Sequence, residues 1–95
     1  MIINHLLIRL KDSSDTKIEE TQEVLLKMKG NIATLLDMQV KVDIRRDSSS
    51  YDLMLITKFA SITDMEAYLV DPLHQEISIF IGSVLDSSAS VCYEA

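Results

Sequence analysis

The chain contains 95 residues, 47% of them hydrophobic and 25% charged, and has a formal net charge of −6 at pH 7. This length predicts one domain, residues 1–95, whose modest core a second chain would help to cover. The acidic balance disfavours a nucleic-acid surface, which needs a basic stripe. The single cysteine, Cys92, excludes an internal disulfide, and no apolar run approaches the roughly 18 residues of a membrane span. Because the chain also shows no charged leader, we expect a cytoplasmic protein.

The first predicted elements are a strand and a helix. Residues 2–11 alternate as a strand, with one side formed by Asn4, Leu6, Ile8 and Leu10 and the other by His5, Leu7, Arg9 and Lys11. Residues 12–15 form a polar turn that supplies helix caps. From Thr16 the apolar spacing becomes helical, and Gly30 is a natural end for this helix.

Two further strands follow. The clearest half-buried strand runs from Leu36 to Arg45, with one side formed by Leu36, Met38, Val40, Val42 and Ile44. A short polar link, residues 47–50, connects it to a strand over residues 51–59. The shortness of this link predicts an antiparallel hairpin.

The last third of the chain predicts a broken helix and a final strand. Ser61 is a good N-cap for a helix that ends near Val70. Asp71 and Pro72 then supply an N-cap followed by proline at the first helical position, which restarts a helix as far as about Leu85. Residues 87–93 complete the chain as a strand.

This element order predicts an α+β, ferredoxin-like fold (β-α-β-β-α-β), in which a four-stranded antiparallel sheet has its helices on one face. The first and third strands are then central. Their helix-facing sides contain Leu6, Ile8, Leu10, Leu53, Leu55 and Phe59. Their other sides contain Leu7, Met54 and Ile56, which no helix covers, so we expect these three side chains to form a homodimer interface. The alternative is a monomer with a few scattered exposed apolar side chains.

His74 is the strongest candidate for chemistry, because helical spacing places it between Ile81 and Leu85, facing the sheet. An apolar site disfavours the charged imidazole, so the neutral ring could act as a base. The alternative is a core histidine whose ring bonds a carbonyl or hydroxyl. Tyr68 lies at the border of the preceding helix's apolar face, where its hydroxyl could orient a substrate, bond His74 or simply reach the surface.

The other polar side chains give weaker signals. Strict alternation turns His5 away from the helices and places Asn4 on the helix side. Cys92 has no cationic neighbours in sequence, which favours an unreactive, buried thiol. Phosphate-binding glycine loops and Cys/His metal spacings are absent, so we expect neither a cofactor nor a metal.

Four segments resemble the stress-responsive α/β-barrel domain (Dabb) family of the dimeric α/β-barrel superfamily. They are residues 3–11 (INHLLIRLK), 50–59 (SYDLMLITKF), 66–75 (EAYLVDPLHQ) and 91–94 (VCYE). The resemblance implies a homodimer whose two sheets pack open face to open face. Most of the family has no assigned activity, and a few relatives are polyketide cyclases that use a histidine and a tyrosine in a pocket between sheet and helices. Tyr68 and His74 match these two positions, whereas the opening strand is one residue short, which moves His5 out of register, and Asp71 stands where the family often has histidine.

We therefore expect a stress-related homodimer of unassigned activity that binds a small apolar ligand between sheet and helices. The residues expected to line this pocket are Asn4, Leu6, Ile8, Leu53, Leu55, Ile77 and Ile81. One alternative is a cyclase- or lyase-like enzyme with His74 as general base and Tyr68 as orienting acid. Another is a purely structural dimerisation module.

Overall fold

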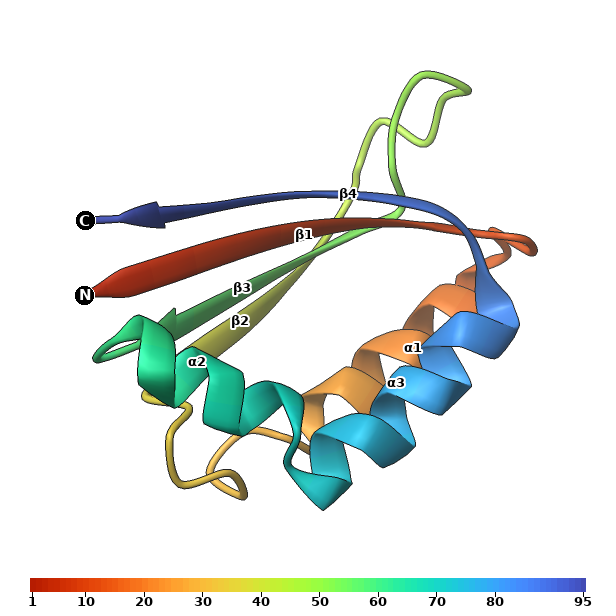
Figure 1. The fold of residues 1–95 in the computed structure, drawn as a ribbon. Coiled ribbons are helices and arrows are strands. Elements are labelled where there is room, and N and C mark those ends of the chain that lie inside the picture. The colour runs from red at the N-terminus through yellow and green to blue at the C-terminus, as the bar shows by residue number, and fades with distance from the viewer.

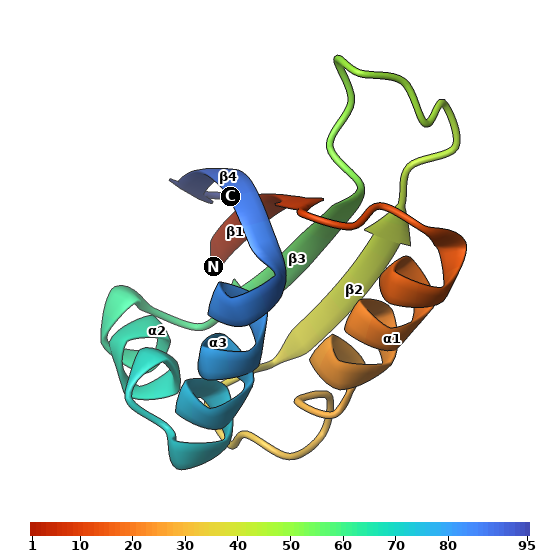
Figure 2. The same ribbon diagram turned by 90° about the vertical axis from the view of Figure 1, so that its right-hand side faces the viewer.

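The computed structural model describes all residues from 1 to 95 and consists of one sheet and three helices (Figure 1). The elements are β1 (Ile2–Leu10), α1 (Asp15–Leu26), β2 (Asp37–Val42), β3 (Leu53–Phe59), α2 (Ile62–Leu69), α3 (Pro72–Val84) and β4 (Leu85–Glu94). All neighbouring strands are antiparallel, in the order β2-β3-β1-β4. The helices lie on one face of the sheet in both views (Figures 1 and 2). The predicted α+β, ferredoxin-like fold with β1 and β3 at its centre is confirmed.

Local capping explains where the helices begin. The hydroxyl of Ser14 accepts a hydrogen bond from the Lys17 amide at the start of α1, and the hydroxyl of Ser61 accepts one from the Asp64 amide at the start of α2. The Asp71 carboxylate accepts the Leu73 amide at the start of α3. Each cap supplies a partner for an amide that the first helical turn leaves free.

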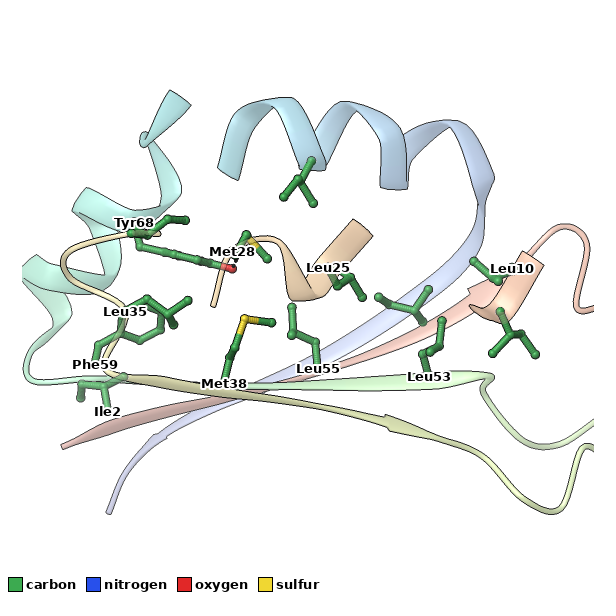
Figure 3. Packing of buried hydrophobic residues seen from close by; sticks show 14 residues of the cluster. Ile2, Leu10, Leu25, Met28, Leu35, Met38, Leu53, Leu55, Phe59 and Tyr68 are labelled. Atoms are coloured by element: carbon green, nitrogen blue, oxygen red, sulfur yellow. Dashed lines mark hydrogen bonds between the residues drawn. The ribbon is translucent and has the colours of Figure 1, made fainter. Parts of the chain in front are cut away.

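The strand register divides the sheet into two different faces. Leu6 pairs with Leu55 and Ile8 with Leu53, and these side chains lie under the helices. The intervening pair, Leu7 and Met54, lies on the opposite face. The buried core on the helix side, shown in Figure 3, consists of Ile2, Ile8, Leu10, Ile18, Leu25, Met28, Ile32, Leu35, Met38, Leu53, Leu55, Phe59, Tyr68 and Ile77.

Four sequence predictions need correction: the end of the first helix, the bounds of the second strand, the start of the third strand and the burial of Cys92. The first helix ends at Leu26, because three-residue turns follow it: the Met28 amide bonds the Leu25 carbonyl and the Lys29 amide bonds the Leu26 carbonyl. Gly30 terminates these turns with a positive φ of 76°. Strand β2 is also shorter than predicted.

The ends of the predicted second strand therefore lie outside the sheet. Leu36 and Ile44 are exposed instead of facing the core, and the third strand begins at Leu53 instead of Tyr51. Cys92 is exposed instead of buried, because it lies on the edge strand β4, whose residues are exposed from Asp86 onward.

Candidate functional site

A cavity of about 250 Å³ lies between the helix-facing side of the sheet and the helices. Its walls come from β1, β3, β4 and from all three helices or their ends. The lining residues are Asn4, Leu6, Ile8, Leu25, Met28, Leu55, Tyr68, Leu69, His74, Ile77, Ser78, Ile81 and Ser90. Six of the seven residues expected to line a pocket are among them, together with Tyr68 and His74.

Leu53, the seventh, is not among the residues that line this cavity. Its side chain faces the helices and is 2% exposed, but it lies two residues along β3 from Leu55, about 7 Å away, toward the end of the strand that follows the 43–52 loop. Sequence reasoning missed Leu25 and Met28, although the apolar face of the first helix already contained both. It also missed Ser90, which reaches the cavity because β4 pairs it with Leu6.

The break between α2 and α3 orients the His74 ring. Pro72 has no amide hydrogen, and the Leu73 amide donates to the Asp71 carboxylate at 2.9 Å. The Leu69 carbonyl is therefore free of the usual helical partner and lies 3.0 Å from Nδ1 of His74. Since a carbonyl only accepts, neutral His74 has its proton on Nδ1, which leaves Nε2 as the basic nitrogen.

The surroundings of His74 favour this neutral form. Partial burial lowers the pKa of His74, and this effect outweighs the hydrogen bond to Leu69 and the nearby carboxylate of Asp71, both of which act in the opposite direction. At neutral pH the imidazole is thus an uncharged hydrogen-bond acceptor at the cavity wall.

Tyr68 is a core residue with a nearly unused hydroxyl. The residue is 5% exposed, and its ring packs between the rings of Phe59 and His74, at centroid distances of 4.9 and 4.4 Å. Its hydroxyl lies 3.7 Å from Sδ of Met28 (Figure 3) and makes no bond to His74. Burial raises the pKa of Tyr68 to about 12, so the phenol remains a neutral donor. A thioether is a weak acceptor, so this donor keeps most of its capacity for a better partner.

Three further residues of the lining are polar, and none is charged. The side chains of Asn4, Ser78 and Ser90 make no hydrogen bond within the protein, and no Asp, Glu, Lys or Arg lines the cavity. The arrangement is suited to a mostly apolar molecule with a few neutral polar groups, because an unpaired charge would be costly to bury here.

His5 lies on the opposite face of the sheet from this cavity, as alternation predicted. Its Nε2 is 3.0 Å from the hydroxyl of Tyr93, and the two rings stack at 5.6 Å. It therefore cannot join Tyr68 and His74 in one site. No cluster of three His, Cys, Asp or Glu side chains is placed to bind a metal, and no helix has the length and hydrophobicity to cross a membrane.

The open face of the sheet is a second candidate surface. Leu7, Met54 and Ile56 are only half-buried there, and β4 adds the exposed side chains of Val91 and Tyr93. These residues are neighbours across three strands, with His5 between Ile56 and Val91, because Leu7 pairs with Met54 while His5 pairs with both Ile56 and Val91. Such an area is typical of an interaction surface.

The lowered pKa of His74 predicts that mild acidification destabilises the protein. Above pH 6.5, the ordinary pKa of histidine, the ring is neutral in both the folded and the unfolded chain. Below it, the unfolded chain binds a proton that the folded chain resists down to its own lower pKa, so the free energy of unfolding decreases. We expect His74→Gln to reduce the fall in the urea midpoint between about pH 7.5 and 5.5. His5→Gln is the control, and an undiminished fall in His74→Gln would contradict the assignment.

Comparisons with known proteins bear on the family and the fold of the chain. A family described as "Stress responsive A/B Barrel Domain" (Dabb) matches residues 3–95. No curated protein matches the chain.

Solved structures share the fold at low sequence identity. A dimeric ferredoxin-like protein of unknown function from Thermobifida fusca has a TM-score of 0.86 and 20% identity, over 99% of this chain and 90% of that one. A protein from Arabidopsis thaliana has a TM-score of 0.85 and 21% identity, over 100% and 95%. Hydroxynitrile lyase from Passiflora edulis has a TM-score of 0.80 and 14% identity, over 97% and 91%. With the family match covering nearly its whole length, the chain belongs to the stress-responsive α/β-barrel domain (Dabb) family.

Proposed function

We propose that this Dabb protein is a cytoplasmic homodimer that binds a small, neutral, largely apolar molecule in the cavity between sheet and helices. The observation that carries this proposal is the Tyr68 hydroxyl. It is buried at the wall of a cavity of about 250 Å³ and has only a thioether as its partner. A buried donor without a good acceptor is unfavourable, and a ligand that accepts from it removes that cost.

The cavity also suggests which polar group the ligand presents. Tyr68 offers a donor, and Nε2 of His74 offers an acceptor. A single hydroxyl on an apolar ring can accept from the first and donate to the second. We therefore favour a ligand with an aromatic or aliphatic body and a neutral hydroxyl or hydroxyl–carbonyl group, and disfavour an anionic one.

Three matched probes test this proposal: naphthalene, 2-naphthol and 2-naphthoate. We expect all three to be small enough for the cavity, and 2-naphthol to bind best. One or two hydrogen bonds should improve its affinity over naphthalene by about two- to tenfold. The carboxylate of 2-naphthoate would enter without a countercharge, so it should bind more weakly than 2-naphthol. Titration calorimetry or intrinsic probe fluorescence measures these affinities at neutral pH.

Tyr68→Phe distinguishes specific binding in the cavity from non-specific hydrophobic binding. The variant should lose the preference for 2-naphthol over naphthalene, whereas Tyr51→Phe, on the far side of the sheet, should retain it. Tightest binding of 2-naphthoate would contradict the neutral-ligand assignment. Failure of all three probes, in a protein that still dimerises, would favour the purely structural dimerisation module.

The homodimer is supported by the open face and by the relatives. Leu7, Met54 and Ile56 are only half-buried within the chain, and the similar Thermobifida fusca protein is described as dimeric. Two such sheets packed face to face would bury these side chains. The solution mass, measured by light scattering or sedimentation, is the direct test.

An enzyme is the second candidate function. The specific observation is Nε2 of His74: the Leu69 carbonyl fixes the proton on Nδ1 and the lowered pKa keeps the ring neutral, so Nε2 is free to accept a proton. A hydroxynitrile lyase has a similar fold. Its activity means that this fold can support catalysis, but it does not indicate a particular reaction for this chain. Mass spectrometry of small molecules that co-purify decides between the two functions. If the protein converts such a molecule and His74→Gln abolishes the conversion, an enzyme with Tyr68 as orienting donor is favoured. If the molecule is recovered unchanged after incubation, a binding protein is favoured.

A further inference from the structure

The loop of residues 43–52, which joins β2 to β3, rises from the sheet on the side opposite the helices (Figures 1 and 2). We propose that this loop is a clasp that grips a second copy of the chain, with Ile44 buried against the partner. The inference deepens the proposed homodimer and rests on it. It assigns an interaction role to a segment that the cavity does not use.

Two arginines hold the loop in one shape. From β1, Arg9 donates to the carbonyls of Ser48 and Ser50, at 3.0 and 2.7 Å. From the loop itself, Arg46 donates to the Asp15 carboxylate at 2.7 Å and to the Ser13 carbonyl at 2.5 Å. These bonds tie the loop to β1 on one side and to the start of α1 on the other.

Carboxylates inside the loop complete this framework. Asp47 accepts from the amide and hydroxyl of Ser49, at 2.9 and 2.7 Å, and from the hydroxyl of Ser50 at 3.0 Å. Asp43 accepts the Arg46 amide at 2.7 Å, which accompanies the positive φ of 56° at Arg46. A loop ordered in advance loses little conformational entropy when it binds.

The ordered loop presents an apolar side chain to solvent. Ile44 is 94% exposed, and so contributes nothing to the core of its own chain. At the base of the loop lies a hollow of about 300 Å³ whose walls include Leu7 and Met54 of the open face, and also Tyr51 and Val42. The loop and this hollow thus extend the apolar open face at one end of the sheet.

A second copy is the occupant that these positions favour. A body that covers Leu7 and Met54 also reaches the base of the loop, because these two residues line one hollow together with Asp43 and Tyr51 of the loop, which rises on this side of the sheet (Figures 1 and 2). In a two-fold dimer the same patch is used on both chains, so the loop of each protomer contacts the other. One exposed isoleucine per chain therefore becomes two contacts per dimer.

Ile44→Asp tests the clasp, with Ile79→Asp on the outer side of α3 as the matched control. Both isoleucines are highly exposed, at 94% and 77%, so neither substitution should disturb the fold of the chain. We expect Ile44→Asp to raise the dimer dissociation constant at least about tenfold in sedimentation equilibrium, and Ile79→Asp to leave it unchanged. Ile44→Ala should act in the same direction with a smaller effect, and circular dichroism verifies that each variant is folded.

The outcomes separate the clasp from the dimer itself. A wild-type dimer with the same dissociation constant in Ile44→Asp overturns the clasp and leaves the homodimer intact. A wild-type chain that stays monomeric at every concentration overturns the homodimer and the clasp with it. An Ile44→Asp variant that loses only the binding of some other protein, with its self-association unchanged, also overturns the proposal.

Discussion

Replacing Ile81 with tryptophan is expected to lower the affinity for 2-naphthol more than about tenfold relative to the wild type. Ile81 lies on α3 at the cavity wall and is half-buried. An indole at this position would occupy much of a cavity of about 250 Å³ from within. Calorimetric titration measures the loss directly.

Ile79→Trp is the control for this substitution. Ile79 is two residues away on the same helix and points to solvent, at 77% exposure, so the added indole should leave the affinity unchanged. Overpacking can itself cost about 1–3 kcal/mol, so the thermal midpoint of Ile81→Trp must show a folded protein. Unchanged affinity in a folded Ile81→Trp protein would place the binding site elsewhere.

Replacing Met54 with aspartate is expected to convert the dimer to a monomer. Met54 is at the centre of the open face, paired with Leu7 in β1 and with Lys41 in β2. A face-to-face dimer would bury the new carboxylate twice, in an apolar interface, at a cost of several kcal/mol for each charge. The half-burial of Met54 within one chain means that the monomer itself should still fold.

Ile62→Asp is a suitable control for this experiment. Ile62 is the first residue of α2, on the helix side of the sheet, and is 49% exposed. An acidic residue at the start of a helix interacts favourably with the helix dipole. Light scattering should show a dimer for Ile62→Asp and a monomer for Met54→Asp. An equally stable dimer in both variants would exclude the open face as the interface.

The two candidate surfaces share the same two strands. Leu6 and Leu55 line the cavity, while their neighbours Leu7 and Met54 lie on the opposite face. Strands β1 and β3 therefore form a common wall between the proposed ligand site and the proposed dimer interface. Substitutions on one face should be checked for effects on the other, because closely packed interiors transmit strain.

The architecture and its two faces could be predicted from the sequence. Alternation in residues 2–11 and 51–59 assigned Leu6 and Leu55 to the helix side, and Leu7 and Met54 to the open side, as the register confirms. The caps at Ser61 and Asp71 were likewise readable from the chain. Both signals are local, because side chains alternate between adjacent residues and a cap acts within one helical turn.

The contents of the cavity depended on contacts between distant segments. The partner of the Tyr68 hydroxyl is Met28, forty residues earlier in the chain, and no local pattern links them. Ser90 enters the cavity only through its pairing with Leu6, while Leu53, although buried on the same side of the sheet, is not part of the lining. Local periodicity determined which face each side chain occupies, whereas the position along that face, and with it the line between core and cavity, was decided by the packing of helices and strands far apart in sequence.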